Sequence, residues 1–152
     1  GQIIRWREQG ADVTATRFTW DLFLLAGEAQ GGHPDHLTGT INGDIFSSPD
    51  GLAFDAAGRL WIQTDYDDRD PLMQNMGCNQ LLCADPQSRE VRRFLVGPRG
   101  CEITGITFTP DHRTLWINIQ HPKISYPASD GETRPRSTTV MITKEDGGVI
   151  GT

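Results

Sequence analysis

SSPDGLAFDAAGRLWIQTD, residues 47–65, has a second copy further along the chain in CEITGITFTPDHRTLWINIQHP, residues 101–122. Gly51 and Gly105 align at an offset of 54 residues, and the Leu-Trp-Ile runs align at an offset of 55, so the second copy holds one extra turn residue. In both copies alternating apolar residues precede a short polar turn, and an apolar strand follows it. Alternation on both sides of a turn is the pattern of a β-hairpin. The repeat therefore predicts two equivalent hairpins.

Short apolar runs bounded by glycine, proline and polar residues predict the remaining strands. These strands are expected at residues 18–27, 81–84, 91–96 and 138–143. Two stretches without apolar periodicity are predicted to be loops. They are residues 27–44, which are rich in glycine, and residues 127–137, which are polar.

These elements predict an all-β protein, and the spacing of the repeat favours one architecture. A period of about 40 to 50 residues with four short strands per unit is typical of a β-propeller, and the few extra residues of this repeat can lie in a loop on one face. One blade cannot cover both of its faces, so blades must stack on one another. The chain holds roughly two to three blades, whereas a closed propeller needs about four or more. We therefore expect a partial propeller whose partners are the remaining upstream blades, or copies of itself. A self-contained β-sandwich is the alternative.

Composition limits the classes of partner. A net charge of −6 and a pI of about 5.1 provide no broad basic surface, so nucleic acid is not expected as a partner. No apolar run is long enough to span a membrane, and no membrane partner is expected. The sequence has no GxSxG, HExxH, GxxxxGK or GxGxxG motif, which argues against serine hydrolase chemistry and nucleotide binding.

The three cysteines do not decide the compartment. Cys78 and Cys83 either form a disulfide in an oxidising compartment or are buried small residues. Cys101 is a candidate soft metal ligand or nucleophile. None of them has the paired spacing of a zinc site.

Two carboxylates stand at the start of the strand that would line a propeller channel. Asp50 precedes Gly51 in the first copy, and Glu102 occupies the corresponding region of the second. Carboxylates from successive blades would converge near the axis, in the oxygen-rich arrangement that calcium or iron needs. The alternative is that Asp50 only forms a turn and that Glu102 only satisfies a backbone amide.

Other candidates lie in loops or at strand ends. His121 is equivalent to Asp65 of the first copy, and both are expected at the end of the blade away from the strand start; His121 is either a ligand or a hydrogen-bonding loop residue. His33 and His36 flank Asp35 in a loop that could bind metal, although a flexible surface loop is favoured. The acidic residues at 65–70 resemble a calcium loop only loosely, and a solvated turn is favoured.

Taken together, four segments resemble a known family. FTWDLFLLAG, SSPDGLAFDAAGRLWIQTD, GCNQLLCADPQSREVRRFLVGPRGCEITG and ITFTPDHRTLWINIQHP follow one another in the order and spacing of the C-terminal half of PhoX-type alkaline phosphatases. The resemblance covers roughly residues 1 to 125. PDGLAFD-x-x-GRLW alone is shared with gluconolactonase-like propellers, and GCEITG and NIQHP make the resemblance more specific.

The resemblance implies a secreted, metal-dependent phosphatase. It implies that residues 1–152 are the C-terminal part of a six-bladed propeller that is exported by the twin-arginine route, hence periplasmic or secreted. It implies hydrolysis of phosphate monoesters with calcium and iron held at the axis. Asp50 of SPDG and Glu102 of CEITG are then the metal-ligand candidates, and His121 of NIQHP matches the motif. Catalytic residues are unassigned, and the isolated chain is expected to be inactive because ligands from other blades are missing.

Two other functions remain open at this stage. One is a non-catalytic propeller scaffold that binds a protein or sugar through the loop at 27–44. The other is a gluconolactonase-like hydrolase that uses a single divalent cation. The metal complement separates the phosphatase from the lactonase.

Overall fold

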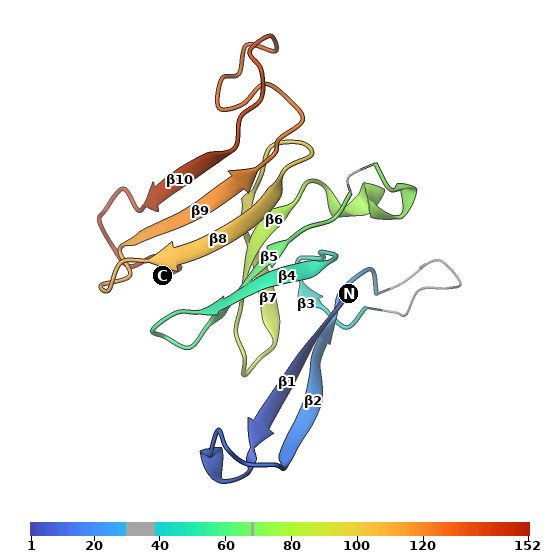
Figure 1. The fold of residues 1–152 in the computed structure, drawn as a ribbon, viewed down its shortest axis with the longest axis vertical. Coiled ribbons are helices and arrows are strands. Elements are labelled where there is room, and N and C mark those ends of the chain that lie inside the picture. Colours follow the sequence, from blue (N-terminus) through green and yellow to red (C-terminus); the bar gives the residue numbers. More distant parts are fainter. Residues whose placement is uncertain (30–38, 68) are drawn as a thin grey trace.

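The computed structural model describes residues 1–29, 39–67 and 69–152, and in this part of the chain it is all-β, with two short 3-10 helices and no α-helix (Figure 1). The strands are β1 (Gln2–Glu8), β2 (Phe18–Leu25), β3 (Asn42–Gly43), β4 (Pro49–Phe54), β5 (Leu60–Thr64), β6 (Gln80–Ala84), β7 (Glu90–Val96), β8 (Glu102–Phe108), β9 (Thr114–Gln120) and β10 (Thr138–Thr143). The helices are η1 (Gln9–Ala11) and η2 (Pro71–Met76). The predicted all-β class and the predicted hairpins are confirmed.

The central sheet contains the first copy of the repeat. Strands β4, β5, β6 and β7 form an antiparallel meander in sequence order, and the short β3 pairs in parallel with β7 at its edge. Every residue of β5 is buried, which means that other elements cover both faces of this sheet. One face packs on the hairpin of β1 and β2, and the other packs on the sheet of β8 to β10.

The second copy forms a three-stranded sheet in the order β10-β9-β8, again antiparallel. Burial alternates along β9, so one face of this sheet is covered and the other is more open. The covered face contributes Leu115, Ile117 and Ile119 to a core cluster that also contains Trp61 of β5. Three separate sheets, in place of the two facing layers of a sandwich, make up the described chain.

A bulge interrupts the inner strand of each copy, and glycine explains why. The register of both β4 and β8 shifts in mid-strand. A Cβ on Gly51 would lie 1.8 Å from Nε2 of Gln63, and a Cβ on Gly105 would lie 2.2 Å from Nδ2 of Asn118. A side-chain amide of the paired strand thus lies against each bulge. Both amides directly follow the Leu-Trp-Ile run of their copy.

Several smaller predictions have clear outcomes. Part of the loop expected at 27–44 lies outside the described residues, and the loop also contains the two-residue strand β3, which the sequence pattern did not predict. The helix η2 was also not predicted. Cys78 and Cys83 are not joined by a disulfide. Within the described part of the chain, no helix has the length and apolar character needed to cross a membrane.

Candidate functional site

The candidate residues gather at one edge of the molecule because the repeated hairpins are antiparallel. In the first copy Pro49 pairs with Thr64, and in the second Glu102 pairs with Gln120. The start of each inner strand therefore lies beside the end of the next strand. This overturns the expectation that Asp65 and His121 lie away from the strand starts, because a hairpin returns the chain to the edge from which it left.

Glu102 is the most enclosed member of this edge. Its side chain is 12% exposed, and one carboxylate oxygen, Oε2, accepts a hydrogen bond from Nε2 of Gln120. The ring nitrogen Nε2 of His121 lies 3.5 Å from the same oxygen. Burial raises the pKa of Glu102, and the charge of Asp65 raises it further, whereas His121 and the hydrogen bond from Gln120 lower it; the net shift is upward.

Carboxylates of the first copy lie close enough to Glu102 to act on it. Asp50 and Asp65 are both exposed, and the charge of each raises the pKa of Glu102. The backbone N–H of Asp65 donates to the carbonyl of Ser48 at 3.2 Å, which holds the end of β5 against the start of β4. The edge thus collects Asp50, Asp65, Glu102 and His121 from two sheets. Within residues 1–29, 39–67 and 69–152, however, no three His, Cys, Asp or Glu side chains are arranged closely enough to hold a metal ion.

Backbone strain marks the same edge in both copies. Ser48, just before β4, has a φ of 45°, and His121, just after β9, has a φ of 36°. Both are left-handed conformations that non-glycine residues rarely adopt. Such residues cost roughly 1–3 kcal/mol each and concentrate at functional sites. The N–H of His121 donates to Oγ of Ser137 at 2.9 Å, which helps to fix this conformation.

The side chain of Asn79 connects the segments of this edge through hydrogen bonds. Its Oδ1 accepts hydrogen bonds from Oγ1 of Thr64 at 2.7 Å and from the N–H of Tyr66 at 3.1 Å. Its Nδ2 donates to the carbonyls of Tyr66 at 2.9 Å and Cys101 at 2.7 Å. Because Asn79 is buried, this one amide fixes the side chain of Thr64 before Asp65, the backbone of Tyr66 after it, and the backbone immediately before Glu102.

Gln63 links the two copies directly. The residue is 3% exposed, and its side-chain Oε1 accepts the N–H of Ile106, in the bulge of β8, at 2.7 Å. Sequence reasoning assigned no role to Gln63 or Asn79. The first had a detectable signal, because an amide follows Leu-Trp-Ile in both copies, whereas nothing in the local sequence distinguishes Asn79.

The remaining candidates have different outcomes. His33, Asp35 and His36 lie outside the described residues. In the acidic loop, Asp67 pairs with Arg69, whose hydrogen bonds lower the pKa of that carboxyl. Cys101 is 1% exposed, so water and substrate do not reach its thiol.

Comparison with known proteins identifies the family. The family model described as alkaline phosphatase PhoX matches residues 1–123. The chain therefore belongs to the PhoX alkaline phosphatase family, in agreement with the resemblance found in the sequence. A search of curated proteins gives no significant match.

A solved structure agrees with this assignment. The chain is similar to Pseudomonas fluorescens PhoX, solved in complex with vanadate, a transition state analogue, with a TM-score of 0.89 and 48% sequence identity. The match covers 99% of this chain and 27% of the PhoX chain. Residues 1–152 thus correspond to about a quarter of that relative.

Proposed function

We propose that residues 1–152 are the C-terminal part of a metal-dependent PhoX phosphatase that hydrolyses phosphate monoesters. The observation that carries the proposal is the edge where Glu102, Asp50, Asp65 and His121 gather from two sheets in a member of this family. In this proposal β4 to β7 form one propeller blade, and β8 to β10 form part of the next. The rest of a longer PhoX chain supplies the other blades, so the isolated piece is inactive.

The donor chemistry of the edge fits the two cations that the resemblance implies. Calcium takes about six to eight oxygen ligands, and Glu102 and Asp50 supply carboxylate oxygens. Iron accepts imidazole together with carboxylate, which His121 and Glu102 offer. The set is incomplete in the described residues, so further ligands would come from other blades. When bound, the cations would supply Lewis acidity toward a phosphoryl oxygen.

The role of this chain would be to hold the ligands in place. Glu102 is held by Gln120, and Asn79 and Gln63 fix the backbone around it. Asp50 and Asp65 would present further negative charge from the adjacent sheet. Like charges at one edge repel each other, and bound cations would offset that repulsion. Membership of the PhoX family favours this function over the single-cation lactonase. We also propose a periplasmic or secreted location, which rests on the resemblance alone.

The test uses a hybrid chain, in which residues 1–152 replace the matched quarter of Pseudomonas fluorescens PhoX. We expect the hybrid chain to retain calcium and iron in elemental analysis and to hydrolyse p-nitrophenyl phosphate. Glu102→Gln keeps the size of the side chain and removes its charge, so we expect it to lower kcat/KM by about 100-fold or more, on the order of 2.7 kcal/mol, together with the metal content.

A matched control separates this effect from a general loss of charge. Glu132→Gln changes an exposed glutamate in the loop after β9, and it should leave the metal content and kcat/KM unchanged. Full metal content and activity in the Glu102→Gln variant would overturn the assignment of Glu102. A hybrid chain that folds without binding calcium or iron would overturn the proposed function itself.

A further inference from the structure

The rim loop, residues 121–137 between β9 and β10, begins at the edge that carries Glu102. Figure 1 shows this loop extending beyond the end of the β8–β10 sheet, on the side opposite to the β1–β2 hairpin. Glu102 pairs with Gln120 across the sheet, and the N–H of the next residue, His121, donates to Oγ of Ser137 at 2.9 Å. The two ends of the rim loop therefore meet directly beside the proposed metal ligands.

Hydrogen bonds give the rim loop a defined backbone. The N–H of Arg136 donates to the carbonyl of Tyr126 at 2.9 Å and closes the neck of the loop. Nearer the tip, Oδ1 of Asp130 accepts the hydroxyl of Ser125 at 2.6 Å and the N–H of Thr133 at 2.8 Å. The same partners lower the pKa of Asp130, so its carboxylate is ionised and already has donors. These bonds fix the backbone at Arg136 relative to the edge.

The rim loop carries two arginines without acceptors. Arg134 and Arg136 are exposed, and within the described part of the chain neither guanidinium has a hydrogen bond or an ion pair. By contrast, Arg5 and Arg59 are each bound to an aspartate. Pro135 favours extended backbone at the residue before it. Residues two apart in an extended segment face the same side, so the Arg-Pro-Arg sequence presents both guanidinium groups together.

We propose that Arg134 and Arg136 form a subsite for a second phosphate group of the substrate, so that this chain favours phosphate monoesters that carry a further phosphate. This inference rests on the proposed function, in which metals at the edge hold the phosphate that is cleaved. Because the rim loop extends beyond the edge, it meets the leaving group of the ester. The planar guanidinium fork donates two parallel hydrogen bonds to phosphate oxygens, which makes arginine suited to this role.

The charge of the edge gives such a subsite a purpose. The chain has a net charge of −6, and Asp50 and Asp65 are both exposed at the edge. A substrate with an additional phosphate is repelled more strongly by these carboxylates than a simple ester is. Two guanidinium groups beside His121 offset that repulsion where the second phosphate lies. Lys123 of the same loop already faces an acidic residue, since its Nζ lies 3.8 Å from Oδ1 of Asp67.

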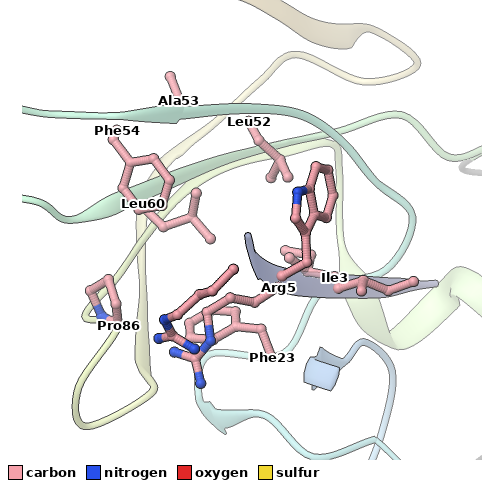
Figure 2. A pocket seen from close by; sticks show the side chains of 11 residues that line it. Ile3, Arg5, Phe23, Leu52, Ala53, Phe54, Leu60 and Pro86 are labelled. Carbon is pink, nitrogen blue, oxygen red and sulfur yellow. The ribbon is translucent and has the colours of Figure 1, made fainter. Parts of the chain in front are cut away.

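The apolar pocket elsewhere in the chain does not suit a phosphate group. It has a volume of about 410 Å³ and lies between the β1–β2 hairpin and β4 (Figure 2). Phe54 and Leu60 are among the apolar side chains that line it, and Arg5, which also lines it, is bound to Asp21 at 2.7 Å. Transfer of a charged group into apolar surroundings is costly. The rim loop is therefore the better place for a second anionic group.

The test compares glucose 6-phosphate and glucose 1,6-bisphosphate as substrates of the hybrid chain. We expect the double variant Arg134→Gln/Arg136→Gln to raise the KM for the bisphosphate at least about tenfold, because the second phosphate loses two charged donors. The kcat for the bisphosphate and both constants for glucose 6-phosphate should stay within about twofold. The matched control Arg7→Gln/Arg17→Gln removes two exposed arginines from the β1–β2 hairpin and should leave every constant unchanged.

A lysine variant separates recognition from general attraction of anions. Arg134→Lys/Arg136→Lys keeps the charge and removes the planar fork, so we expect it to restore the KM for the bisphosphate only in part. Full restoration by lysine, an equal rise of KM for both substrates, or an equal effect of the control would overturn the subsite. An unchanged KM in the glutamine variant of an active hybrid chain would overturn the subsite alone. A hybrid chain that hydrolyses neither sugar phosphate would overturn the proposed function and the subsite with it.

Discussion

The two copies of the repeat share a local pattern but differ in how their strands are covered. In the first copy all of β5 is buried, because the β1–β2 hairpin covers one face and the second copy covers the other. In the second copy only alternate residues of β9 are buried. The direction of each side chain is the same in both, since Leu60 and Leu115 both face the preceding element. The pattern therefore sets which way a residue points, and the position of its sheet in the stack sets whether it is buried.

The tryptophans give the largest expected difference between the copies. Trp61 is fully buried, stacks edge-on with Phe94 and Phe108, and donates its indole N–H to Oδ2 of Asp55 at 2.9 Å. Trp116 points to the more open face of its sheet and is only half-buried. We expect Trp61→Ala to lower the free energy of unfolding by about 3–5 kcal/mol and Trp116→Ala by about half of that or less.

Urea denaturation followed by far-UV circular dichroism measures both variants. Similar losses would mean that the face bearing Trp116 is also covered in solution, for example by another copy of the chain. Light scattering would then show whether the chain associates, and both variants would be measured again at a concentration at which it is monomeric. A Trp61→Ala variant that is unfolded at zero denaturant would agree with the expected order.

The turns of the two copies carry their carboxylates in different surroundings, since Asp55 of the first turn is buried and Asp111 of the second is exposed, which predicts a difference in pH dependence. Asp55 in the first turn aligns with Thr109 in the second. Burial acts to raise the pKa of Asp55, but hydrogen bonds from Trp61 and Arg59 outweigh it, and the net shift is downward. A carboxyl with a lowered pKa in the folded state stabilises the protein above its unfolded pKa, and this stabilisation is lost as the pH falls through the folded value.

Asp55→Asn tests this difference. At pH 7 we expect it to cost about 1–3 kcal/mol, because the charged acceptor for the guanidinium of Arg59 is lost. Below about pH 4 the gap between wild type and variant should shrink, because Asp55 takes up a proton in the unfolded wild-type chain there, and it should go on shrinking until the pH has fallen through the lowered pKa of the folded state. Thr109→Ser, at the matching turn, should change the free energy of unfolding by the same amount at every pH. A gap for Asp55→Asn that is constant from pH 7 to pH 3 would show that the charge of Asp55 contributes nothing.

The sequence predicted most of the strands because hairpins depend on local patterns. Alternation, turn residues and the repeated Leu-Trp-Ile run were enough to place β4, β5, β8 and β9. The two-residue β3 was not predicted, because its pairing with β7 depends on tertiary contact and leaves no periodicity. The bulges were not predicted either, although Gly51 and Gly105 were visible, because the amide that fills each bulge belongs to the partner strand.

Prediction of the candidate site was less complete. Asp50, Glu102 and His121 were found from their places in the repeat and from the family motifs. The prediction that His121 lies at the end of the blade away from the strand start was wrong, because an antiparallel hairpin brings the end of its second strand beside the start of its first. Asn79 could not be found from sequence, since its four hydrogen bonds join segments that lie far apart in the chain.

Substitutions of Gln63 and Asn118 have the smallest expected effects on stability, and they test most specifically how the two copies differ. Gln63 reaches from the first copy to the N–H of Ile106 in the second, whereas Oδ1 of Asn118 accepts the hydroxyl of Thr139 on the adjacent strand of its own sheet. Gln63→Leu leaves the N–H of Ile106 without its acceptor, so we expect a loss of about 1–2 kcal/mol in the free energy of unfolding. Asn118→Leu removes an exposed hydrogen bond and should cost about 0.5 kcal/mol or less.

Stability alone does not show whether Gln63 joins the two copies, and double-mutant cycles do. Because Gln63 connects the copies, the effects of Gln63→Leu and Glu102→Gln on the free energy of metal binding to the hybrid chain should not add. We expect a coupling energy of more than about 0.5 kcal/mol. Asn118→Leu, confined to one sheet, should add to Glu102→Gln without coupling. Coupling for neither variant would mean that the bond to Ile106 stabilises the contact between the sheets without positioning Glu102. Equal coupling for both would mean that any amide beside a bulge positions the edge, and that the difference between the copies lies only in their burial.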